Sequence, residues 1–245
     1  MALPPRPVLD ERREYVARAT QERWIVPLLK SAILEALDAH AHTKSGDKAL
    51  DAGCGGQPFR SDIESRGFHY LSLDAVAAVG VRPDFLCALD APLPSACRDA
   101  GPFQLILCTE VLEHVADWAA ALANLRDMLS PGGALIITCP FVYPLHEEPF
   151  DFWRPTPHAI AHWAARSGLT ILEQRRLGDC WDVLGTLIGA ARPKAIGRGP
   201  VPWLLARIAR TRRKFDCAIA DSQFVRSRVA LEAPLYLSNL VVLTR

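Results

Sequence analysis

Short apolar runs recur along most of the chain, and stretches with apolar residues at helical spacing separate them. The runs predict strands at residues 48–52, 70–74, 84–88, 103–108, 134–139, 169–175 and 236–244. The helical spacing predicts helices at residues 59–66, 116–129 and 156–166, the last beginning at Thr156 and closing at Gly168. Strands that alternate with helices are typical of an α/β fold with a doubly wound, mostly parallel sheet, here of seven strands.

Two segments differ from this alternation. Apolar residues at helical spacing predict a helix from Glu11 to about His40, which Pro27 should kink or divide. Residues 183–214 carry eight basic side chains and no acidic one. We expect one domain, because 245 residues suit a single large core. Its parts are an N-terminal helical cap (1–45, with a proline-rich, poorly ordered start at 1–10), a core (46–180), a basic insertion (181–230) and a last strand (231–245).

Composition narrows the class of protein. The net charge is +1, which gives no sign of a nucleic-acid partner. The seven cysteines form no CxxC pair and no zinc-ligand spacing, as expected in a reducing compartment. The first residues lack the apolar core of a signal peptide, and no run of about eighteen apolar residues could cross a membrane. We therefore expect a cytoplasmic protein with no transmembrane segment.

The first predicted strand runs directly into a glycine-rich turn. Asp51 ends the strand, and Gly53, Gly55 and Gly56 follow it. Glycine lets the backbone bend sharply and lie close to a ligand, and a helix after such a turn aims free N–H groups at that ligand. The alternative interpretation is a plain strand–turn–helix connection.

Three further motifs accompany this turn. The first ends the second predicted strand, the next follows the fourth strand, and the last precedes the fifth. They are Asp74, the stretch Thr109-Glu110-Val111-Leu112-Glu113-His114, and Pro131-Gly132-Gly133. From residue 50 to residue 177 the set resembles the class I S-adenosylmethionine-dependent methyltransferases, most closely the quinone-biosynthesis and small-molecule enzymes. The resemblance implies a Rossmann-like methyltransferase fold with an antiparallel last strand, S-adenosylmethionine as cofactor and a small-molecule substrate.

The motif residues lie at the carboxyl ends of strands, where open α/β sheets bind ligands. Asp51 could anchor the cofactor amine, and Asp74 could accept both ribose hydroxyls, although a helix N-cap is an alternative for Asp74. A dehydrogenase is the main rival class, and Pro58 opposes it because its missing N–H cannot serve a pyrophosphate. The predicted cofactor-binding residues are Asp51, Gly53, Gly55, Gly56, Asp74, Leu89, Asp90 and Ala91 (flanking the adenine), Thr109 and Glu110.

The stretch from residue 140 to residue 156 is the candidate acceptor site, because it follows the fifth strand. His146 is the predicted general base, with Asp151 orienting it, since a hydroxyl acceptor must lose a proton near neutral pH. The predicted substrate-binding residues are Tyr143, Phe150, Trp153 and Arg154. Arg154 would bind a substrate anion or pair with Asp151 or Glu148, and a purely structural His–Asp–Arg lattice is the alternative.

This pattern predicts O-methylation of a small-molecule hydroxyl, on a sugar, a lipid-linked molecule or a secondary metabolite. The alternatives are N- or C-methylation and a non-catalytic protein that binds S-adenosylmethionine. Glu113 and His114 look catalytic, but we favour a framework role in which they cap and orient the next helix. A metal held by His146, Glu147, Glu148 and Asp151 is a weaker alternative without a recognised spacing, so we predict no metal.

The basic insertion allows three interpretations. Residues 202–214 have an apolar side and a basic side, so they could form a lid over an anionic substrate or lie on an anionic membrane surface. They could also form an ordinary packed helix with a solvated basic face. RNA binding is not favoured, because it needs a wider basic surface.

Overall fold

A seven-stranded sheet forms the centre of the protein in the computed structural model, which describes residues 12–245. Its order is β3-β2-β1-β4-β5-β7-β6, and β7 runs in the opposite direction to the other six strands. The strands are β1 (Lys48–Ala52), β2 (His69–Asp74), β3 (Phe85–Leu86), β4 (Phe103–Thr109), β5 (Leu129–Pro140), β6 (Thr170–Leu177) and β7 (Ser238–Thr244). The predicted doubly wound fold and its antiparallel last strand are confirmed.

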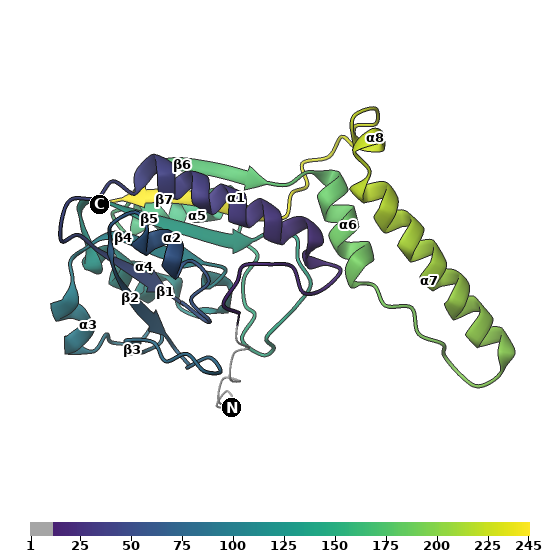
Figure 1. Cartoon of the computed structure of the whole chain (residues 1–245), viewed down its shortest axis with the longest axis horizontal. Coiled ribbons are helices and arrows are strands. Elements are labelled where there is room, and N and C mark those ends of the chain that lie inside the picture. The colour runs from purple at the N-terminus through teal and green to yellow at the C-terminus, as the bar shows by residue number, and fades with distance from the viewer. Residues whose placement is uncertain (1–11) are drawn as a thin grey trace.

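Helices cover both faces of this sheet (Figure 1). One face packs against α1 and α2, and the other against α3, α4 and α5. The two clusters share the strands, because successive side chains of a strand point to opposite faces: Leu105 and Leu107 join one cluster and Ile106 joins the other. The helices are α1 (Glu22–His40), α2 (Arg60–Glu64), α3 (Ser95–Ala100), the short 3-10 helix η1 (Leu112–His114), α4 (Trp118–Met128), α5 (Pro157–Arg166), α6 (Cys180–Ala190), α7 (Pro200–Asp221) and α8 (Gln223–Arg226).

The N-terminal helix is shorter than predicted. It begins at Glu22, and residues 12–21 form no helix. Pro27 lies inside α1 without dividing it. One missing N–H removes one hydrogen bond, and the buried side chains along α1, such as Leu29 and Ile33, keep the helix on the sheet. The predicted poorly ordered segment 1–10 lies outside the described residues.

The helix at the end of the candidate acceptor loop is confirmed with its cap. The Thr156 side chain accepts a hydrogen bond from the Ala159 N–H, and Gly168 follows the helix with a φ of 69°. Elsewhere the predicted bounds shift by a few residues. The strand β5 begins five residues early, at Leu129, because the chain through Pro131-Gly132-Gly133 already follows the sheet. The six-residue α3 was not predicted, since it buries one side chain, Cys97, and shows no periodicity.

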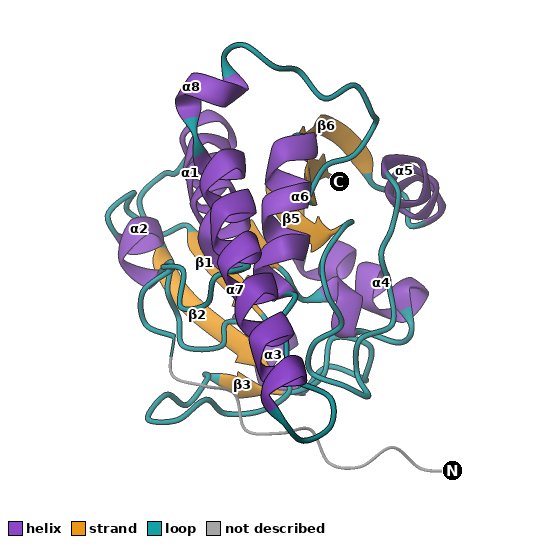
Figure 2. Ribbon diagram, turned by 90° about the vertical axis from the view of Figure 1, so that its right-hand side faces the viewer, coloured by secondary structure: helices purple, strands orange, loops and turns teal. Residues whose placement is uncertain are grey.

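The basic insertion folds into helices that leave and re-enter the sheet at one edge. The strand β6 ends at Leu177, α6 begins at Cys180, and the chain returns to the sheet at Ser238, the partner of Leu177. Since β7 is antiparallel to both β5 and β6, β6 runs in the same direction as the parallel strands. The insertion therefore leaves the sheet at the carboxyl ends of these strands. Figures 1 and 2 show α6 against α1, and α7 reaching outward beyond α6. In residues 12–245 no helix combines the length and the apolar character that a bilayer crossing demands.

Candidate active site

The glycine-rich turn after β1 is shaped by close packing on one side and open space on the other. Gly53 has a φ of 82°, and a Cβ built on it would lie 2.3 Å from the Cγ2 atom of Val111. Gly55 has a φ of 47°, but a Cβ there would meet nothing within 4 Å. A side chain at Gly55 would therefore fill the space in front of the turn, which is a place for a ligand that approaches the backbone closely.

Asp74, at the end of β2, holds this turn in place. Its Oδ2 atom accepts a hydrogen bond from the Gly55 N–H at 2.9 Å, and its Oδ1 atom accepts one from the Val76 N–H at 3.1 Å. No helix follows Asp74 before β3, so the alternative of a helix N-cap is wrong.

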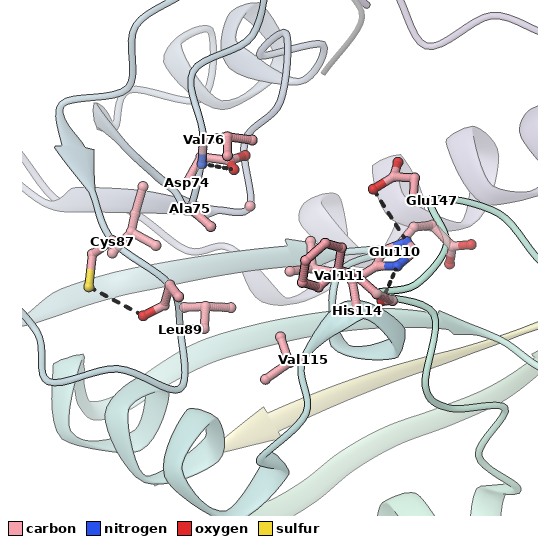
Figure 3. Close-up of a pocket in the computed structure, with 14 residues that line it drawn as sticks. Asp74, Ala75, Val76, Cys87, Leu89, Glu110, Val111, His114, Val115 and Glu147 are labelled. Carbon is pink, nitrogen blue, oxygen red and sulfur yellow. Dashed lines mark hydrogen bonds and ion pairs between the residues drawn. The ribbon is translucent and has the colours of Figure 1, made fainter. Parts of the chain in front are cut away.

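Two adjacent pockets lie at the carboxyl edge of the sheet. They share four residues, Gly53, Glu110, His114 and Glu147. In the first pocket, Asp74, Val76, Cys87 and Leu89 lie opposite Glu110, Val111, His114 and Glu147 (Figure 3). Its remaining lining residues include Ala88, Val115 and Phe150. The second pocket is lined by Asp51, Gly55, Gly56, Thr109, Tyr143 and His146, among others.

Asp51 is a buried carboxyl group at the wall of the second pocket. It is 2% exposed, and the Tyr70 hydroxyl donates a hydrogen bond to its Oδ2 atom at 2.7 Å. Burial raises the pKa of Asp51 to about 7; the bond from Tyr70 opposes this shift and the charge of Asp74 adds to it. A cation bound beside Asp51 would stabilise its ionised form.

Two more carboxyl groups, the half-buried Glu110 and the fully buried Glu113, follow β4. The Ser238 hydroxyl donates to the Oε1 atom of Glu110 at 3.1 Å, while the Oε1 atom of Glu113 finds no hydrogen-bond partner within residues 12–245. Burial raises the pKa of both groups, and the neighbouring Glu110 raises that of Glu113 further. Glu110 and Glu147 adopt left-handed φ angles of 53° and 52°, and such strain in non-glycine residues concentrates at functional sites.

His146 reaches the second pocket from the loop after β5. Its Nδ1 atom lies 3.2 Å from the carbonyl oxygen of Pro144 and 3.3 Å from the Oδ2 atom of Asp151. Both neighbours are acceptors, so Nδ1 carries the proton and Nε2 keeps its lone pair. Burial lowers the pKa of His146, and the nearby His114 ring lowers it further. The ring is therefore a neutral base at pH 7.

Asp151 and Arg154 form the anchor of this loop. Both carboxylate oxygens of Asp151 accept hydrogen bonds from the Arg154 guanidinium, at 2.5 and 2.7 Å. Burial alone would raise the pKa of Asp151, but the bonds from Arg154 and from the His146 N–H outweigh it and lower the pKa. Of the pairings predicted for Arg154, the one with Asp151 is confirmed.

Some predicted site residues lie outside the lining of both pockets. Arg154 is one of them, and Trp153 is another, because its Nε1–H donates to the Val115 carbonyl at 2.9 Å. Asp90 accepts a long bond of 3.4 Å from the Asp117 N–H, and the Ala91 carbonyl accepts one from Asn124. Roles for these four residues in binding remain predictions. The predicted residues that the two pockets bring together are Asp51, Gly53, Gly55, Gly56, Asp74, Leu89, Thr109, Glu110, Tyr143, His146 and Phe150.

Glu113 and His114 hold the acceptor loop rather than the next helix. The Phe152 N–H donates to the Glu113 carbonyl at 2.8 Å, and His114 Nδ1 donates to the Phe150 carbonyl at 2.9 Å. The prediction that the pair caps α4 is wrong: Asp117 is the N-cap, accepting from Ala120. The cap falls to Asp117 because η1 separates Glu113 and His114 from the helix.

Within residues 12–245, the side chains that lie close enough together to share a cation are not the set that the sequence suggested. Among residues 12–245, the ligand atoms of Glu113, His114 and His146 lie within 4.8 Å of one another. Glu148 and Asp151 are not part of this group. Three donors of this kind resemble a partial metal site, but they are fewer than the six or more oxygen ligands that a hard cation takes, and Glu113 is fully buried.

Sequence reasoning missed the N-terminal contribution to the second pocket. Arg12, Tyr15 and Glu22 line it, and a Cβ on Gly56 would lie 2.4 Å from the Arg12 carbonyl oxygen. Arg12 donates to Glu22 at 3.0 Å, which ties this segment to α1. Tyr15 belongs to the apolar pattern that predicted a helix from residue 11 to about residue 40, so the sequence signal pointed to a helix instead.

These groups fit S-adenosylmethionine. The open cradle at Gly55 suits close backbone contact, the buried Asp51 suits an ammonium group, and Asp74 brings a carboxylate, which ribose hydroxyls can donate to, into the lining of the first pocket. Val76 and Leu89 supply apolar walls near Asp74, as a flat adenine requires.

Comparison with known proteins shows the family of the chain. A family model described as a methyltransferase domain matches residues 19–174, more than half of the chain. A ubiquinone biosynthesis O-methyltransferase from Marinobacter nauticus is 31% identical over 105 residues, which cover 38% of this chain and 44% of that protein. A malonyl-[acyl-carrier protein] O-methyltransferase from Erwinia billingiae is 30% identical over 168 residues, covering 62% and 66%. The matches therefore span between about half and two thirds of the relatives' own length.

Solved structures share the fold across nearly the whole chain. The cyclopropane synthase MmaA2 from Mycobacterium tuberculosis has a TM-score of 0.55 at 16% identity, covering 94% of this chain and 90% of that one. A methyltransferase from Archaeoglobus fulgidus has a TM-score of 0.51 at 12% identity, covering 92% and 97%. The chain belongs to the methyltransferase-domain family, within the class I S-adenosylmethionine-dependent methyltransferases, and its cofactor is S-adenosylmethionine.

Proposed function

We propose that this protein is an enzyme that transfers a methyl group from S-adenosylmethionine to a hydroxyl group of a small molecule. One observation carries the proposal: the glycine-rich turn and the neutral His146 line the same pocket. An acceptor in that pocket can contact a base at one end while the cofactor lies against the turn at the other. The names of both curated relatives describe O-methyltransferases, which supports the choice of oxygen.

The roles of the chain's own residues follow from their places in the two pockets. When bound, S-adenosylmethionine would supply a methyl group on a positively charged sulfur: the acceptor oxygen would form the new bond to the methyl carbon as the carbon–sulfur bond breaks, and S-adenosylhomocysteine would be released. Asp51 would hold the ammonium group, and Asp74 would accept hydrogen bonds from the ribose hydroxyls. The second pocket positions the acceptor, and close positioning itself lowers the barrier.

His146 takes the proton of the acceptor hydroxyl at Nε2 as the oxygen attacks. The new charge on the imidazole is stabilised by Asp151, whose Oδ2 lies 3.3 Å from Nδ1. Arg154 keeps Asp151 ionised and fixed in place. The Tyr143 ring packs edge-on against the His146 ring, with the two centroids 5.4 Å apart, and so helps to orient the base.

The N-terminal cap and the basic insertion belong to the same catalytic domain in this proposal. Residues 12–22 close the second pocket, and α6 packs on α1. A Cβ on Gly185 of α6 would lie 2.4 Å from the Trp24 ring, so the two helices are in close contact. We retain a cytoplasmic location as part of the proposal, and all seven cysteines are free, in keeping with a reducing compartment.

Calorimetric titration of the purified protein with S-adenosylmethionine, S-adenosylhomocysteine and NAD tests the cofactor part of the proposal. We expect saturable binding of the first two and none of NAD. A screen with methyl-labelled cofactor then tests the acceptor, using hydroxylated aromatics, sugars, carboxyl-bearing thioesters and primary amines as separate panels. Label in a hydroxyl panel supports O-methylation. Label only in the amine panel would replace it with N-methylation, and cofactor binding without label in any panel would favour a non-catalytic protein.

A further inference from the structure

The outward side of α7 carries large apolar side chains that nothing in the described chain covers. Leu204, Ile208 and Phe215 share this side with Thr211, at spacings of four, three and four residues, and together they line a shallow groove with Arg207 and Arg212. We call Leu204, Ile208, Thr211 and Phe215 the α7 apolar face. The apolar side chains of this face are more than half exposed, and so are their apolar neighbours Val201, Trp203 and Leu205.

The opposite side of α7 makes its contacts with the rest of the protein. Ala206, Cys217 and Ala220 are buried there, and the Arg213 guanidinium donates to the carbonyls of Ile188 and Gly189 at the end of α6. The helix is therefore amphipathic, with its contact side already used. An ordinary packed helix would expose its polar side and bury its apolar one, so that interpretation of residues 202–214 is wrong.

The lid interpretation finds no support in the pockets. No basic residue between residues 192 and 214 lines either pocket of the candidate active site. Figure 1 shows why: α7 points away from the sheet, and its first turns are its most distant part.

Positive charge surrounds the α7 apolar face. From residue 183 to residue 215 the chain has eight basic residues and no acidic one; Asp216 follows and pairs with Arg212 at 2.8 Å, which leaves the other seven without an acidic neighbour in this segment. Arg207 stacks on the Trp203 ring at 5.5 Å, which places a cation directly beside an exposed aromatic side chain. Ile196, in the loop that leads into α7, is 91% exposed. Helices that lie on anionic bilayers combine Trp, Phe and Leu on one face with Lys and Arg beside them.

We propose that α7 docks on the surface of an anionic lipid bilayer. The apolar face would enter the interface between headgroups and acyl chains, while Arg198, Arg207 and Lys214 contact anionic headgroups. A second copy of the chain fits less well, because two α7 apolar faces placed together would also bring their arginines together. Nucleic acid fits less well too, since it would pair with the cations and leave the apolar side chains in water.

The position of α7 determines which part of the protein would face the bilayer. The insertion leaves the sheet at the edge where the parallel strands end, which is the edge of the two pockets. Docking through α7 would hold this edge close to the bilayer. The proposal concerns lipid binding and does not depend on the nature of the methyl acceptor.

Vesicle co-sedimentation with the full chain tests this proposal. We expect the protein to pellet with vesicles of phosphatidylcholine and phosphatidylglycerol in equal parts, and not with phosphatidylcholine alone. High salt should weaken the binding, since it screens exposed charges. A charge variant (Arg198→Gln, Arg207→Gln, Lys214→Gln) and an apolar variant (Leu204→Gln, Ile208→Gln, Phe215→Gln) should each bind at least about ten-fold more weakly.

Matched control variants carry the same changes elsewhere on the surface. Lys30→Gln, Lys44→Gln and Arg98→Gln remove three exposed charges, and Val79→Gln, Leu86→Gln and Leu172→Gln remove three exposed apolar groups. Both controls should bind vesicles as the unchanged protein does. Circular dichroism and cofactor titration check that all four variants remain folded.

Several outcomes would overturn the proposal. One is the absence of any vesicle binding, and another is binding that the two α7 variants leave unchanged. Analytical ultracentrifugation measures the oligomeric state. A dimer that only the apolar variant dissociates, together with no vesicle binding, would assign the face to a second copy. Binding to a short RNA that the charge variant weakens, again without vesicle binding, would assign it to nucleic acid.

Discussion

The Nδ1 atom of His146 lies 3.3 Å from the Oδ2 atom of Asp151, and the Arg154 guanidinium holds both oxygens of the same carboxylate. This arrangement is compatible with both interpretations that the sequence left open, a structural His–Asp–Arg lattice and a general base. The His–Asp–Arg set does fix the loop, since Asp151 also accepts the His146 N–H at 2.9 Å. The same contacts direct the proton to Nδ1 and leave Nε2 available, so a structural lattice and a base are compatible in one group.

Replacing His146 tests the base directly. In His146→Asn the amide cannot take a proton from the acceptor, so we expect turnover with a hydroxyl acceptor to fall by about 10²- to 10⁴-fold. The affinity for S-adenosylmethionine should change little, because the cofactor residues at the glycine-rich turn are untouched. Calorimetry and initial rates measure the two effects separately. His162→Asn, at an exposed position of α5, is the control, and undiminished turnover in His146→Asn would remove His146 from the mechanism.

The pH profile tests whether Asp151 acts through His146. The charge of Asp151 raises the pKa of His146, opposing burial and His114, which lower it. In Asp151→Asn that support is lost and Arg154 remains, so the pKa of His146 should fall further. We expect the acidic limb of the rate profile, already below the ordinary range of histidine, to move to lower pH, with a lower rate on the plateau. A variant that loses rate without moving the limb would show that Asp151 only holds the loop.

Cofactor binding should release protons near neutral pH. Burial raises the pKa of Asp51 to about 7, so part of the population is protonated at pH 6.5. The cofactor's ammonium group would stabilise the carboxylate and lower its pKa, which expels up to about one proton per molecule bound. Calorimetry in buffers of different ionisation enthalpy counts these protons.

The release should fade as the pH rises above about 8, where Asp51 is already ionised. In Asp51→Asn it should vanish at every pH, while the amide still accepts the bond from Tyr70. An apparent binding enthalpy that does not vary with the buffer at pH 6.5 would contradict the ion pair between Asp51 and the cofactor.

The sheet could be predicted because its strands are short apolar runs between turn residues. The first strand, Lys48–Ala52, agrees residue for residue, since Gly46 precedes it and Gly53 follows it. The glycine turn and Asp74 could be predicted because residue type alone marks them. Glycine residues indicate a sharp turn, and Asp74 is the acidic residue that ends the next apolar run. The two residues then meet through a hydrogen bond of 2.9 Å.

Contacts made only by tertiary packing could not be predicted. Nothing in the pattern around Tyr15 shows that its segment crosses Gly56 instead of forming a helix. Trp153 looks like an aromatic wall for a substrate, yet its indole serves the Val115 carbonyl. The two sides of α7 could be predicted from helical periodicity. Only the fold shows that the apolar side is the exposed one.

Asp74 should be essential for cofactor affinity. Both of its oxygens accept backbone N–H groups, from Gly55 and Val76. In Asp74→Asn one oxygen becomes an NH₂ group, which cannot accept, so one of these donors loses its partner and the turn loosens. We expect the dissociation constant for S-adenosylmethionine to rise by at least about ten-fold, which corresponds to 1.4 kcal/mol. Asp99→Asn, at an exposed position of α3, should bind as the unchanged protein does.

The contact between α1 and α6 offers a prediction about stability. Gly185 lies so close to the Trp24 ring that a Cβ would be 2.4 Å from its Cε2 atom, and the ring is buried and cannot swing away freely. We therefore expect Gly185→Ala to separate the two helices and to lower the free energy of unfolding by about 1–3 kcal/mol. Leu184→Ala, at the exposed neighbouring position, should change it by no more than about 0.5 kcal/mol. Urea denaturation measures both, and hydrogen exchange should show faster exchange in α6 and α7 of Gly185→Ala. Equal stability in the two variants would mean that α6 does not pack on α1 in this way.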